Sequence, residues 1–499
     1  MPEVTVQNDP CSEGVAIVIF GVTGDLARRK LMPALYENAK HDRLPTPFYI
    51  LGFARRSWSH EKMRDVLRQG VYDHGRTRPI DEGILEGLLE NAYYIESTFQ
   101  DQSGYTRLDE VLTQIGVQNT LFYLSTPPGW YATIVENIGQ SQLESCPEGW
   151  RRIVVEKPFG RDLETALTLD QKLHSVFVED QIYRMDHYLG KETVQNILAF
   201  RFGNGIFEPL WNRKYIDHIQ ITMAESEGVG TRAGYYDKAG VVRDVFQNHL
   251  LQLLTLTAME APAVFNAKAV RDEKVKVLKS IEKFSEETDL ENTFRAQYVS
   301  GTIDGKRVPS YRDEPDVASD SITETYMAAR LHVNNWRWAG VPFYLRSGKR
   351  LPRRATEIAI QFTQVPLALF GQRNLAGEAP NVLVIRIQPN EGITLFLGAK
   401  VPGNTMRIEP VEMRFNYSEA FGGEPPEAYE RLLLDCLMGD ATLFTRSDEV
   451  EEAWRLTQRI IDAWEAQDLQ NLPVYEAGTQ GPHGTDDFIR DDGRHWRRI

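Results

Sequence analysis

Apolar residues in the first third of the chain form short continuous runs that are bounded by turn residues. These runs are VAIVIF at 15–20, FYILGFA at 48–54, LFYLST at 121–126 and RIVVEKPFG at 152–160. Between them lie segments with the apolar spacing of helices, such as HEKMRDVLRQGVYD and DLETALTLDQKLHSVF. Strands that alternate with helices predict a mostly parallel, doubly wound sheet, and continuously apolar strands are typical of burial on both faces.

The pattern changes after residue 215. A long helical pattern at 239–260 precedes segments in which apolar and polar residues alternate, at 356–362, 381–388, 393–400 and 411–417. Such alternation predicts half-buried strands of an antiparallel sheet. Two helical patterns follow, YERLLLDCLM and SDEVEEAWRLTQRIIDAWEAQ, and we expect the tail from residue 477 to be irregular. The chain is therefore expected to form an α/β Rossmann-like dinucleotide-binding domain over 1–185 and a larger α+β domain with a mainly antiparallel sheet over 186–499.

Composition and charge limit the kinds of molecule that this protein is expected to bind. The net charge of −15 would repel a nucleic-acid backbone and gives no attraction to an anionic membrane surface, so we expect neither partner. Cys11, Cys146 and Cys436 lie far apart, and no pair has metal-ligand spacing. An odd number of cysteines in so long a chain indicates a reducing compartment. No secretory signal is visible, and the most apolar stretch, at 249–259, is too short to span a bilayer. We expect a soluble, cytoplasmic protein.

The segment GVTGDLARRK at 21–30 directly follows the first apolar run. Gly21, Gly24 and Ala27 have the spacing GxxGxxA, which suits a tight turn, close approach to a pyrophosphate and packing of a helix on a strand. The helix start would offer unpaired N–H groups to phosphate, and Thr23 would add a hydroxyl. An ordinary strand-to-helix turn fits the same letters, and Pro33 would kink or shorten the helix.

The end of the second apolar run bears on the choice of dinucleotide. It reads GFARRS, with Arg55 and Arg56 where NAD-binding proteins usually have Asp or Glu. A guanidinium can bind a 2′-phosphate through two hydrogen bonds, whereas a carboxylate would repel it. The pattern favours NADP, and an exposed pair of surface arginines is the alternative interpretation.

Two further stretches carry groups that suit a phosphorylated ligand. EKPFG at 156–160 ends a predicted strand, so Lys157 would reach the ligand crevice, and a strand-ending turn with a cis or trans Pro158 is the alternative. In YRMDHYLGKETVQN at 183–196, His187 and Lys191 would share one face of a helical turn beside Tyr188. That arrangement predicts a phosphate clamp in which Gly190 admits the anion. A solvated helix start is the alternative, and the spacing does not suit a metal.

RDVFQNHLLQ at 243–252 contains a histidine before a strongly apolar run. His249 should therefore lie partly buried at one end of a core helix. Imidazole is a natural base for an alcohol proton when a carboxylate orients it. Asp186 and Asp244 are the candidate carboxylates, and spacing does not choose between them, since Asp244 would point elsewhere on the same helix. A structural histidine is the alternative.

Taken together, five stretches resemble the glucose-6-phosphate dehydrogenase family: GVTGDLARRKLMPAL, EKPFG, YRMDHYLGKE, RDVFQNHLLQ and VPFYLRSGKRL, in this order. The resemblance extends from 15 to 470. It implies oxidation of β-D-glucose 6-phosphate at C1 to 6-phosphoglucono-1,5-lactone with hydride transfer to NADP, the first step of the oxidative pentose phosphate pathway. It also implies a second domain whose sheet forms the subunit interface, in a homodimer or homotetramer.

The resemblance assigns roles to individual residues. It implies that His249 is the general base that removes the C1 hydroxyl proton and that Asp186 is its carboxylate partner. It implies substrate binding by Lys157, His187, Tyr188, Lys191, Glu225, Asp244, Lys349 and Arg354. It implies NADP binding by Gly21, Val22, Thr23, Gly24, Asp25, Leu26, Ala27, Arg28, Arg55, Tyr123 and Lys157.

Two departures from the family pattern limit these expectations. Thr23 stands where many strictly NADP-using relatives have serine, so use of NAD as well stays open. Animal members bind a second, structural NADP, and two basic positions used there are Ala355 and Ala359 here, although Arg346 and Arg386 remain. We expect no structural NADP site. The alternatives to this enzyme are a sugar oxidoreductase of the glucose–fructose oxidoreductase and inositol dehydrogenase type, and a catalytically silent assembly or regulatory relative.

Overall fold

The computed structural model describes residues 14–283, 286–364, 381–422, 426–467 and 471–499. The chain packs into two compact units. The N-terminal unit comprises the residues up to Gly190 together with Phe265–Arg271 and Pro426–Glu451. The C-terminal unit comprises Lys191–Val264, Asp272–Pro425 and Glu452–Ile499. Cys11 lies outside the described residues.

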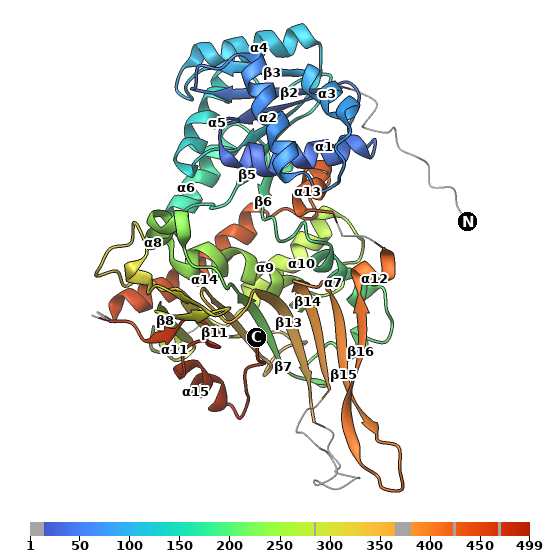
Figure 1. Ribbon diagram of the computed structural model, residues 1–499, viewed down its shortest axis with the longest axis vertical. Helices are drawn as coiled ribbons and strands as arrows, with labels where there is room; N and C mark the ends of the chain where they lie inside the picture. Colours follow the sequence, from blue (N-terminus) through green and yellow to red (C-terminus); the bar gives the residue numbers. More distant parts are fainter. Residues whose placement is uncertain (1–13, 284–285, 365–380, 423–425, 468–470) are drawn as a thin grey trace. The chain divides into compact units, whose positions relative to one another are not determined.

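The N-terminal unit is built on one parallel sheet (Figure 1). Its strands, in the order in which they lie side by side, are β3 (Ala92–Glu96), β2 (Phe48–Ala54), β1 (Val15–Phe20), β4 (Asn119–Leu124), β5 (Arg151–Glu156) and β6 (Ile182–Met185). All neighbouring pairs run parallel. The order reverses direction between β1 and β4, as in dinucleotide-binding Rossmann folds. The predicted Rossmann-like sheet is confirmed.

Helices cover this sheet. They are α1 (Met32–Lys40), α2 (His60–His74), α3 (Glu82–Glu90), α4 (Gln102–Ile115), α5 (Tyr131–Gln140), α6 (Leu163–His174) and α13 (Ala428–Met438). Helix α13 comes from far along the sequence and packs on α1. The strands and helices predicted in the first third are therefore confirmed, with β4 and β5 ending earlier than the apolar runs suggested.

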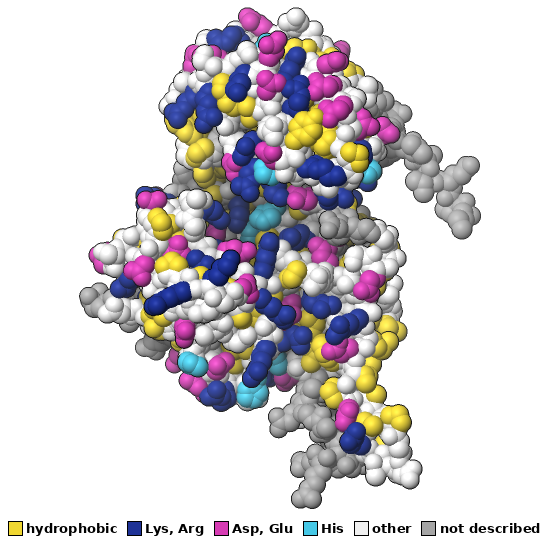
Figure 2. All heavy atoms as spheres, viewed as in Figure 1, with side chains coloured by type: hydrophobic (Ala, Val, Ile, Leu, Met, Phe, Trp, Pro, Cys, Tyr) yellow, Lys and Arg dark blue, Asp and Glu magenta, His cyan; other side chains and the backbone are white. Residues whose placement is uncertain are grey.

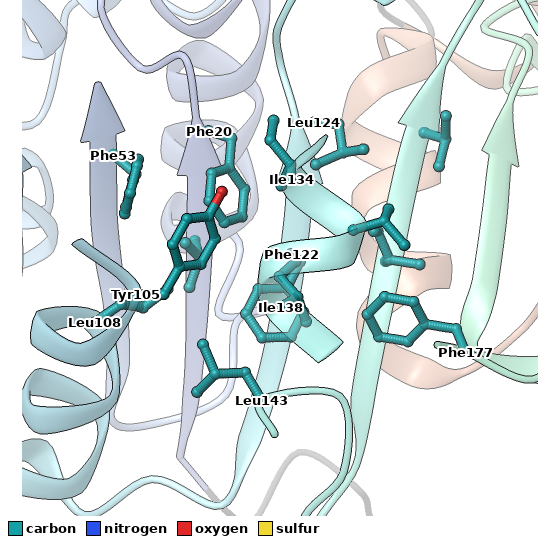
Figure 3. Packing of buried hydrophobic residues seen from close by; sticks show 14 of the residues in the cluster. Phe20, Phe53, Tyr105, Leu108, Phe122, Leu124, Ile134, Ile138, Leu143 and Phe177 are labelled. Carbon is teal, nitrogen blue, oxygen red and sulfur yellow. The ribbon is translucent and has the colours of Figure 1, made fainter. Parts of the chain in front are cut away.

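The strands of this sheet are buried on both faces, as their apolar runs predict. Alternate residues of β1, such as Val18 and Phe20, pack with α4, α5 and α6 in one core, and the intervening Ile19 is buried as well. Figure 3 shows the rings of this core, in which Phe20 lies 5.0 Å from Phe53 and 6.0 Å from Tyr105 between centroids. Burying one large apolar side chain contributes about 2 kcal/mol. The core therefore fixes the strand ends from which the site is built.

The first helix has the irregularity that Pro33 predicts. Residues 27–31 form a π-helical turn, and α1 begins at Met32 with Pro33 in its first turn. Proline lacks an N–H and crowds the preceding turn, so a regular α-helical pattern cannot continue through it. A wider turn before the proline accommodates this constraint.

The C-terminal unit is built on a mixed, mostly antiparallel sheet (Figure 1). Its strands in spatial order are β16 (Ile408–Asn416), β15 (Gly392–Lys400), β14 (Val382–Gln388), β13 (Ala355–Phe362), β7 (Ile216–Ala224), β12 (Pro342–Gly348), β11 (Tyr326–His332), β8 (Thr293–Val299) and β17 (Val474–Glu476). Strand β7 pairs in parallel with β12, and β8 with β17, while the other described neighbours are antiparallel. The predicted α+β character is confirmed.

The remaining elements surround this sheet or connect its strands. The other helices are α7 (Glu192–Phe202), α8 (Ala233–Val241), α9 (Leu251–Ala258), α10 (Ala267–Ser280), α11 (Glu286–Glu291), α12 (Tyr417–Phe421), α14 (Ser447–Ala466) and α15 (Gly484–Arg490). Strands β9 (Gly301–Ile303) and β10 (Lys306–Val308) form a separate ribbon. Short 3-10 turns lie at Pro128–Trp130, Glu179–Gln181, Glu208–Leu210, Gly230–Arg232 and Tyr311–Asp313.

Two segments differ from the sequence prediction. The pattern at 239–260 is not one α-helix, because Gly240, at φ 66°, separates α8 from a π-helical stretch, Val242–Leu250, that leads into α9. The tail that was expected to be irregular contains α15, and its last residues pack on the sheet. Arg494 pairs there with Asp217 at 2.9 Å. The composition of the tail alone does not reveal this contact, because Asp217 is far away in sequence.

The surface carries charges of both signs. Figure 2 shows basic and acidic side chains interspersed over the visible face of each unit. Among the described helices, none combines the length and the apolarity needed to cross a membrane.

Candidate active site

Strand β1 leads into a glycine turn. Gly21 has φ 83°, and a Cβ at this position would lie 2.3 Å from the carbonyl oxygen of Ser125, so only glycine fits. The Gly24 N–H donates to the Gly21 carbonyl oxygen at 2.9 Å, and Ala27 is fully buried behind the turn. Because Ser125 directly follows β4, the turn lies where the strand order reverses, which is where open α/β sheets bind ligands.

The other predicted cofactor residues of this turn differ in exposure. Val22 is buried, Thr23, Leu26 and Arg28 are partly buried, and Asp25 is exposed. The Arg28 guanidinium lies 3.4 Å from the Asp25 carboxylate. An exposed ion pair of this kind contributes only about 0–1 kcal/mol, so the arginine can turn to an anionic ligand at little cost.

Two arginines follow β2, at the position where NAD-binding proteins usually have Asp or Glu. Arg55 and Arg56 are both exposed, and the Arg56 guanidinium lies 5.6 Å from the ring centroid of Trp58. The Tyr94 hydroxyl donates to the carbonyl oxygens of Ala54, at 2.9 Å, or Arg56, at 2.5 Å, which holds the backbone of this turn. Burial raises the pKa of Tyr94 to about 12, so the hydroxyl keeps its proton at neutral pH. These residues and the glycine turn fit a dinucleotide with a 2′-phosphate.

A buried carboxyl group lies at the end of β5, directly before Lys157. Glu156 accepts a hydrogen bond from the Tyr123 hydroxyl at 2.6 Å and one from the Tyr429 hydroxyl at 3.1 Å. Burial raises the pKa of Glu156, and the two phenols and the Lys157 charge oppose that rise. The bond between Lys157 and Pro158 is cis, one of the options that the sequence left open.

The environment of Tyr123 limits how it can act. The sequence predicts Tyr123 as a cofactor residue, but its side chain is fully buried and is bonded to Glu156. Burial is also the main reason that the pKa of Tyr123 lies well above its ordinary value. Any contact with a cofactor would therefore come from the backbone of Tyr123 near the end of β4.

A turn follows β6 and contains three predicted residues. Asp186 is 2% exposed, and its carboxylate accepts the Tyr188 N–H at 3.0 Å. Its carbonyl oxygen accepts the Leu189 N–H at 3.0 Å, so the segment His187–Gly190 forms a turn. The predicted helical turn is wrong here, because α7 begins only at Glu192. The helical spacing between His187 and Lys191 therefore gives no information about a shared face.

Gly190 has a packing role that differs from the predicted one. A Cβ at Gly190 would lie 2.7 Å from the carbonyl oxygen of Ala428 and 2.8 Å from Leu432. These residues belong to α13, so the glycine permits close packing of the turn on that helix. Gly190 is buried, which does not fit the expectation that it admits an anion to the backbone.

Predicted sugar-binding residues line a cavity in the C-terminal unit. Glu225, Lys349 and Arg354 are among its lining residues, together with Arg232 and Tyr236. Glu225 follows β7 and Lys349 follows β12, and these two strands are parallel neighbours, so their ends come together. The Lys349 ammonium donates to the Glu225 carboxylate at 2.5 Å and lies 5.0 Å from the ring centroid of Tyr236. Arg354 is exposed and donates to Gln388 at 3.2 Å.

Asp244 and His249 lie on the π-helical stretch that begins after Gly240. They are 5% and 2% exposed, so both are buried. The carboxylate of Asp244 accepts a hydrogen bond from Arg232 at 3.1 Å. The α-helical geometry assumed for residues 244 and 249 is wrong, because a π-helix repeats its hydrogen bonds every five residues. Helix geometry therefore does not argue against Asp244.

Lys191 and the basic residues considered for a second NADP site lie in the C-terminal unit. Lys191 directly precedes α7, and its charge opposes the burial that raises the pKa of Glu391. Arg346 is buried, donates to Thr222 at 3.0 Å, and has its guanidinium 4.5 Å from the ring centroid of Trp496. These contacts already occupy Arg346 with the sheet and the C-terminal tail.

Sequence reasoning missed three residues that touch the predicted ones: Glu156, Arg232 and Tyr429. Glu156 belongs to the EKPFG stretch, and a carboxyl group ending an apolar strand was a signal for it. Arg232 is close in sequence to Asp244, but nothing in the pattern marks their pairing. Tyr429 had no signal, since its partner Glu156 is 273 residues away.

Two family models match the chain in succession. The "Glucose-6-phosphate dehydrogenase, NAD binding domain" matches residues 18–196, and the "Glucose-6-phosphate dehydrogenase, C-terminal domain" matches residues 198–497. Curated relatives are similar over almost the whole chain. Glucose-6-phosphate 1-dehydrogenase 2 of Mycobacterium tuberculosis is 47% identical over 496 residues, 98% of this chain and 95% of that protein. Glucose-6-phosphate 1-dehydrogenase of Bacillus subtilis is 42% identical over 489 residues, 97% of this chain and 98% of that protein.

Solved structures are similar over the same length. A glucose-6-phosphate dehydrogenase in complex with its substrate glucose-6-phosphate matches with a TM-score of 0.89 and 36% identity, covering 98% of this chain and 99% of that chain. Glucose-6-phosphate 1-dehydrogenase from Mycobacterium avium matches with a TM-score of 0.81 and 36% identity, covering 97% and 98%. On this evidence the chain belongs to the glucose-6-phosphate dehydrogenase family.

Proposed function

We propose that this chain oxidises β-D-glucose 6-phosphate at C1 to 6-phosphoglucono-1,5-lactone with NADP as hydride acceptor, the first step of the oxidative pentose phosphate pathway. The observation that carries the proposal is 47% identity, over 98% of the chain, to a relative named for this activity. The chain also retains His249, Asp186 and Lys157, the three groups on which the family chemistry depends.

The N-terminal unit supplies the residues that would hold NADP. We assign residues 1–185 as the NADP-binding domain and residues 186–499 as the substrate and subunit-contact domain. The glycine turn receives the pyrophosphate at Gly21 and Gly24, Arg55 takes the 2′-phosphate, and Lys157 reaches the crevice. When bound, NADP supplies the acceptor for the hydride that leaves C1. Thr23 stands where many strictly NADP-using relatives have serine, so the proposal includes NAD as a second possible acceptor.

His249 acts as the general base in this proposal. Its imidazole accepts the proton of the C1 hydroxyl while the hydride leaves the same carbon. Asp186 is assigned as its carboxylate partner, which keeps the imidazole in one tautomer and stabilises the imidazolium that forms. Support comes from the burial of both residues, because buried groups keep one orientation and interact strongly with a charge that develops nearby.

The substrate-binding residues, apart from Lys157, belong to the assigned domain 186–499. His187, Tyr188 and Lys191 are assigned to the phosphate, whose charge suits a cation and two hydrogen-bond donors. Glu225, Asp244, Lys349 and Arg354 are assigned to the sugar, for which the cavity of the C-terminal unit offers carboxylate acceptors and cationic donors. Holding the sugar in one orientation supplies much of the rate acceleration in a reaction without a protein nucleophile.

The assembly and location of the protein belong to the same proposal. We infer a homodimer or homotetramer formed through the large sheet of the C-terminal unit. The edge strand β16 supports this, because its Val411 and Met413 are 42% and 61% exposed on a long strand that a partner would protect. Cys146 and Cys436 are free thiols, which supports a reducing, cytoplasmic location.

The two alternative functions are not favoured. A sugar oxidoreductase of the glucose–fructose oxidoreductase type would not require the phosphate-binding stretch DHYLGKE, and the family models and the named relatives point to the dehydrogenase. A catalytically silent relative would not need His249 and Lys157, and both residues are present in this chain.

Initial rates on the purified full chain test the proposal. Wild-type protein should reduce NADP when given glucose 6-phosphate, followed by absorbance of the reduced nicotinamide. His249→Asn should lower kcat by about 10³-fold and leave the Kd of glucose 6-phosphate within about twofold. His218→Asn is the matched control, because His218 is also buried in the C-terminal unit and has no role assigned in binding or catalysis. Loss of substrate binding together with turnover in His249→Asn would show that the base assignment is wrong.

A further inference from the structure

Tyr429 of α13 contacts two parts of the N-terminal unit that carry assigned residues. Its hydroxyl donates to the Glu156 carboxylate at 3.1 Å, and Glu156 directly precedes Lys157. Its ring stacks on the imidazole of His187, with centroids 6.4 Å apart and planes 14° apart. One side chain thus links the strand end that carries Lys157 to the turn that carries His187.

Helix α13 is held in the N-terminal unit by contacts that do not involve Tyr429. Near its start, Arg76 donates through two nitrogens to the Glu430 carboxylate, both at 3.1 Å, and Asn38 donates to the Glu430 carbonyl oxygen at 2.9 Å. Near its end, Arg152 donates to the carbonyl oxygens of Cys436, at 2.7 Å, and Leu437, at 2.6 Å. These contacts hold both ends of α13 in the N-terminal unit independently of the Tyr429 side chain.

The protonation state of the Glu156 carboxyl group depends partly on the phenol groups around it. Glu156 is 8% exposed, and its burial, with a smaller contribution from the Asp186 charge, raises the pKa of the carboxyl group. The hydroxyls of Tyr123 and Tyr429 and the charge of Lys157 favour the carboxylate. The third phenol nearby, Tyr131, donates instead to the backbone carbonyl oxygen of Glu156 at 3.1 Å. Removing the Tyr429 hydroxyl therefore takes away one of the donors that keep a carboxylate beside Lys157.

We propose that Tyr429 is a positioning residue for the reaction, acting through His187 with its ring and through Glu156 and Lys157 with its hydroxyl. The ring lies nearly parallel to the imidazole of His187 and, together with the Tyr188 ring 5.0 Å from that imidazole, limits the orientations in which it can receive the substrate phosphate. The hydroxyl holds the carboxylate that precedes Lys157. This inference rests on the proposed function, in which His187 binds the phosphate and Lys157 reaches the cofactor crevice.

Two substitutions separate the ring from the hydroxyl. Tyr429→Phe keeps the stack on His187 and loses the hydrogen bond, so KM for glucose 6-phosphate should stay within about twofold while kcat falls about fivefold. The acidic limb of its kcat profile should move to higher pH, because Glu156 loses a donor that favours its charged form. Tyr429→Leu loses the stack as well, and KM for glucose 6-phosphate should rise about tenfold.

Unphosphorylated glucose provides the internal comparison, since it lacks the group that His187 is assigned to bind. KM for glucose should be the same, within about twofold, in Tyr429→Leu and Tyr429→Phe. Tyr131→Phe is the matched control, because it removes a phenol hydrogen bond that is made to the backbone carbonyl oxygen of Glu156. Its kcat and both KM values should be those of the wild type.

Three results would overturn the inference, and the measurements distinguish them. If both Tyr429 variants keep the wild-type kcat, KM and pH profile and only melt at a lower temperature, Tyr429 has a packing role alone. If Tyr429→Leu raises KM equally for glucose 6-phosphate and for glucose, the ring does not act through His187. If the wild type itself shows no reduction of NADP with glucose 6-phosphate, the proposed function is wrong and this inference falls with it.

Discussion

Arg55 and Arg56 are consecutive and both exposed, and the Arg56 side chain lies beside an aromatic ring. The Arg56 guanidinium lies over the ring of Trp58, 5.6 Å from its centroid. A cation–π contact at an exposed site contributes about 0.5–1 kcal/mol, which Arg56 would lose in turning to another ligand. The two arginines of the GFARRS stretch therefore differ in how readily they reach a 2′-phosphate, a difference that the sequence does not show.

The first prediction concerns cofactor preference. Arg55→Ala should raise KM for NADP about tenfold to a hundredfold, because a hydrogen-bonded charge pair of about 1.5–3 kcal/mol is lost. KM for NAD should change less than about twofold, since NAD lacks the 2′-phosphate. Arg56→Ala is the matched control, and its effect on NADP should be several-fold smaller. Initial rates with the two cofactors measure this, and an equal loss with NADP and NAD would contradict the role of Arg55.

At the scale of single residues, the sequence predicts a role correctly where a single backbone requirement or a single charge determines which residue fits. Gly21 is such a case, because the positive φ and the nearby Ser125 carbonyl allow no side chain. The pairing of Glu156 with Tyr429 was not predictable, since these residues meet only when α13 packs beside β5, far away in sequence. Arg232 and Asp244 are close in sequence, but their pairing depends on a π-helical turn that the residue pattern did not predict.

The π-helical stretch that carries His249 follows Gly240, whose backbone conformation would strain any other residue. Gly240 has φ 66°, and a Cβ there would lie 2.1 Å from the Glu324 carboxylate. That carboxylate accepts the Val242 N–H at 3.3 Å and is buried, which raises the pKa of Glu324. The apolar spacing at 239–260 predicted a helix correctly. It did not predict the break or the π-helical stretch, because a buried segment that is apolar on all sides fits several helical repeats.

Substitution at this glycine tests the element as a whole. Gly240→Ala should lower the free energy of unfolding of the C-terminal unit by about 2–4 kcal/mol, because strain at positive φ adds to the clash with Glu324. Gly305→Ala is the matched control: Gly305 has φ 75°, with no atom within 4 Å of a Cβ. It should cost only about 1 kcal/mol. Thermal or denaturant unfolding measures the difference, and equal losses would show that the Glu324 contact does not matter.

At the scale of the whole molecule, the chain returns to the N-terminal unit after forming most of the C-terminal one. The segment Pro426–Glu451 belongs to the N-terminal unit, where Lys30 pairs with Glu427 at 2.9 Å and Arg76 with Glu430 at 3.1 Å. The sequence predicted helix α13 from its apolar spacing. Its membership of a unit was not predictable, because an amphipathic helix can bury its apolar face on either sheet.

The C-terminal tail is held on the large sheet by ionised carboxylates. Asp217 accepts a hydrogen bond from His218 at 2.7 Å and two from Arg494, at 2.9 and 3.0 Å. The hydrogen bond from His218, and then those from Arg494, hold the pKa of Asp217 well below its usual range. Because the folded-state pKa is depressed, this stabilisation is complete above the ordinary aspartate pKa of about 3.9. It is lost as the pH falls through the lower, folded-state value.

Acid should therefore release the tail, and one substitution should release it at neutral pH. In the wild type, amide exchange in residues 484–499, corrected for its intrinsic rate, should stay slow above about pH 5 and accelerate toward about pH 3 and below. Asp217→Asn should exchange about fivefold faster at pH 7, a modest effect because the ion pair is partly exposed, and should respond less to acid. Asp25→Asn, which removes an exposed pair of the N-terminal unit, should leave tail exchange unchanged. If acid accelerates exchange equally in the wild type and in Asp217→Asn, another carboxylate, such as Asp492 beside Arg330, holds the tail instead.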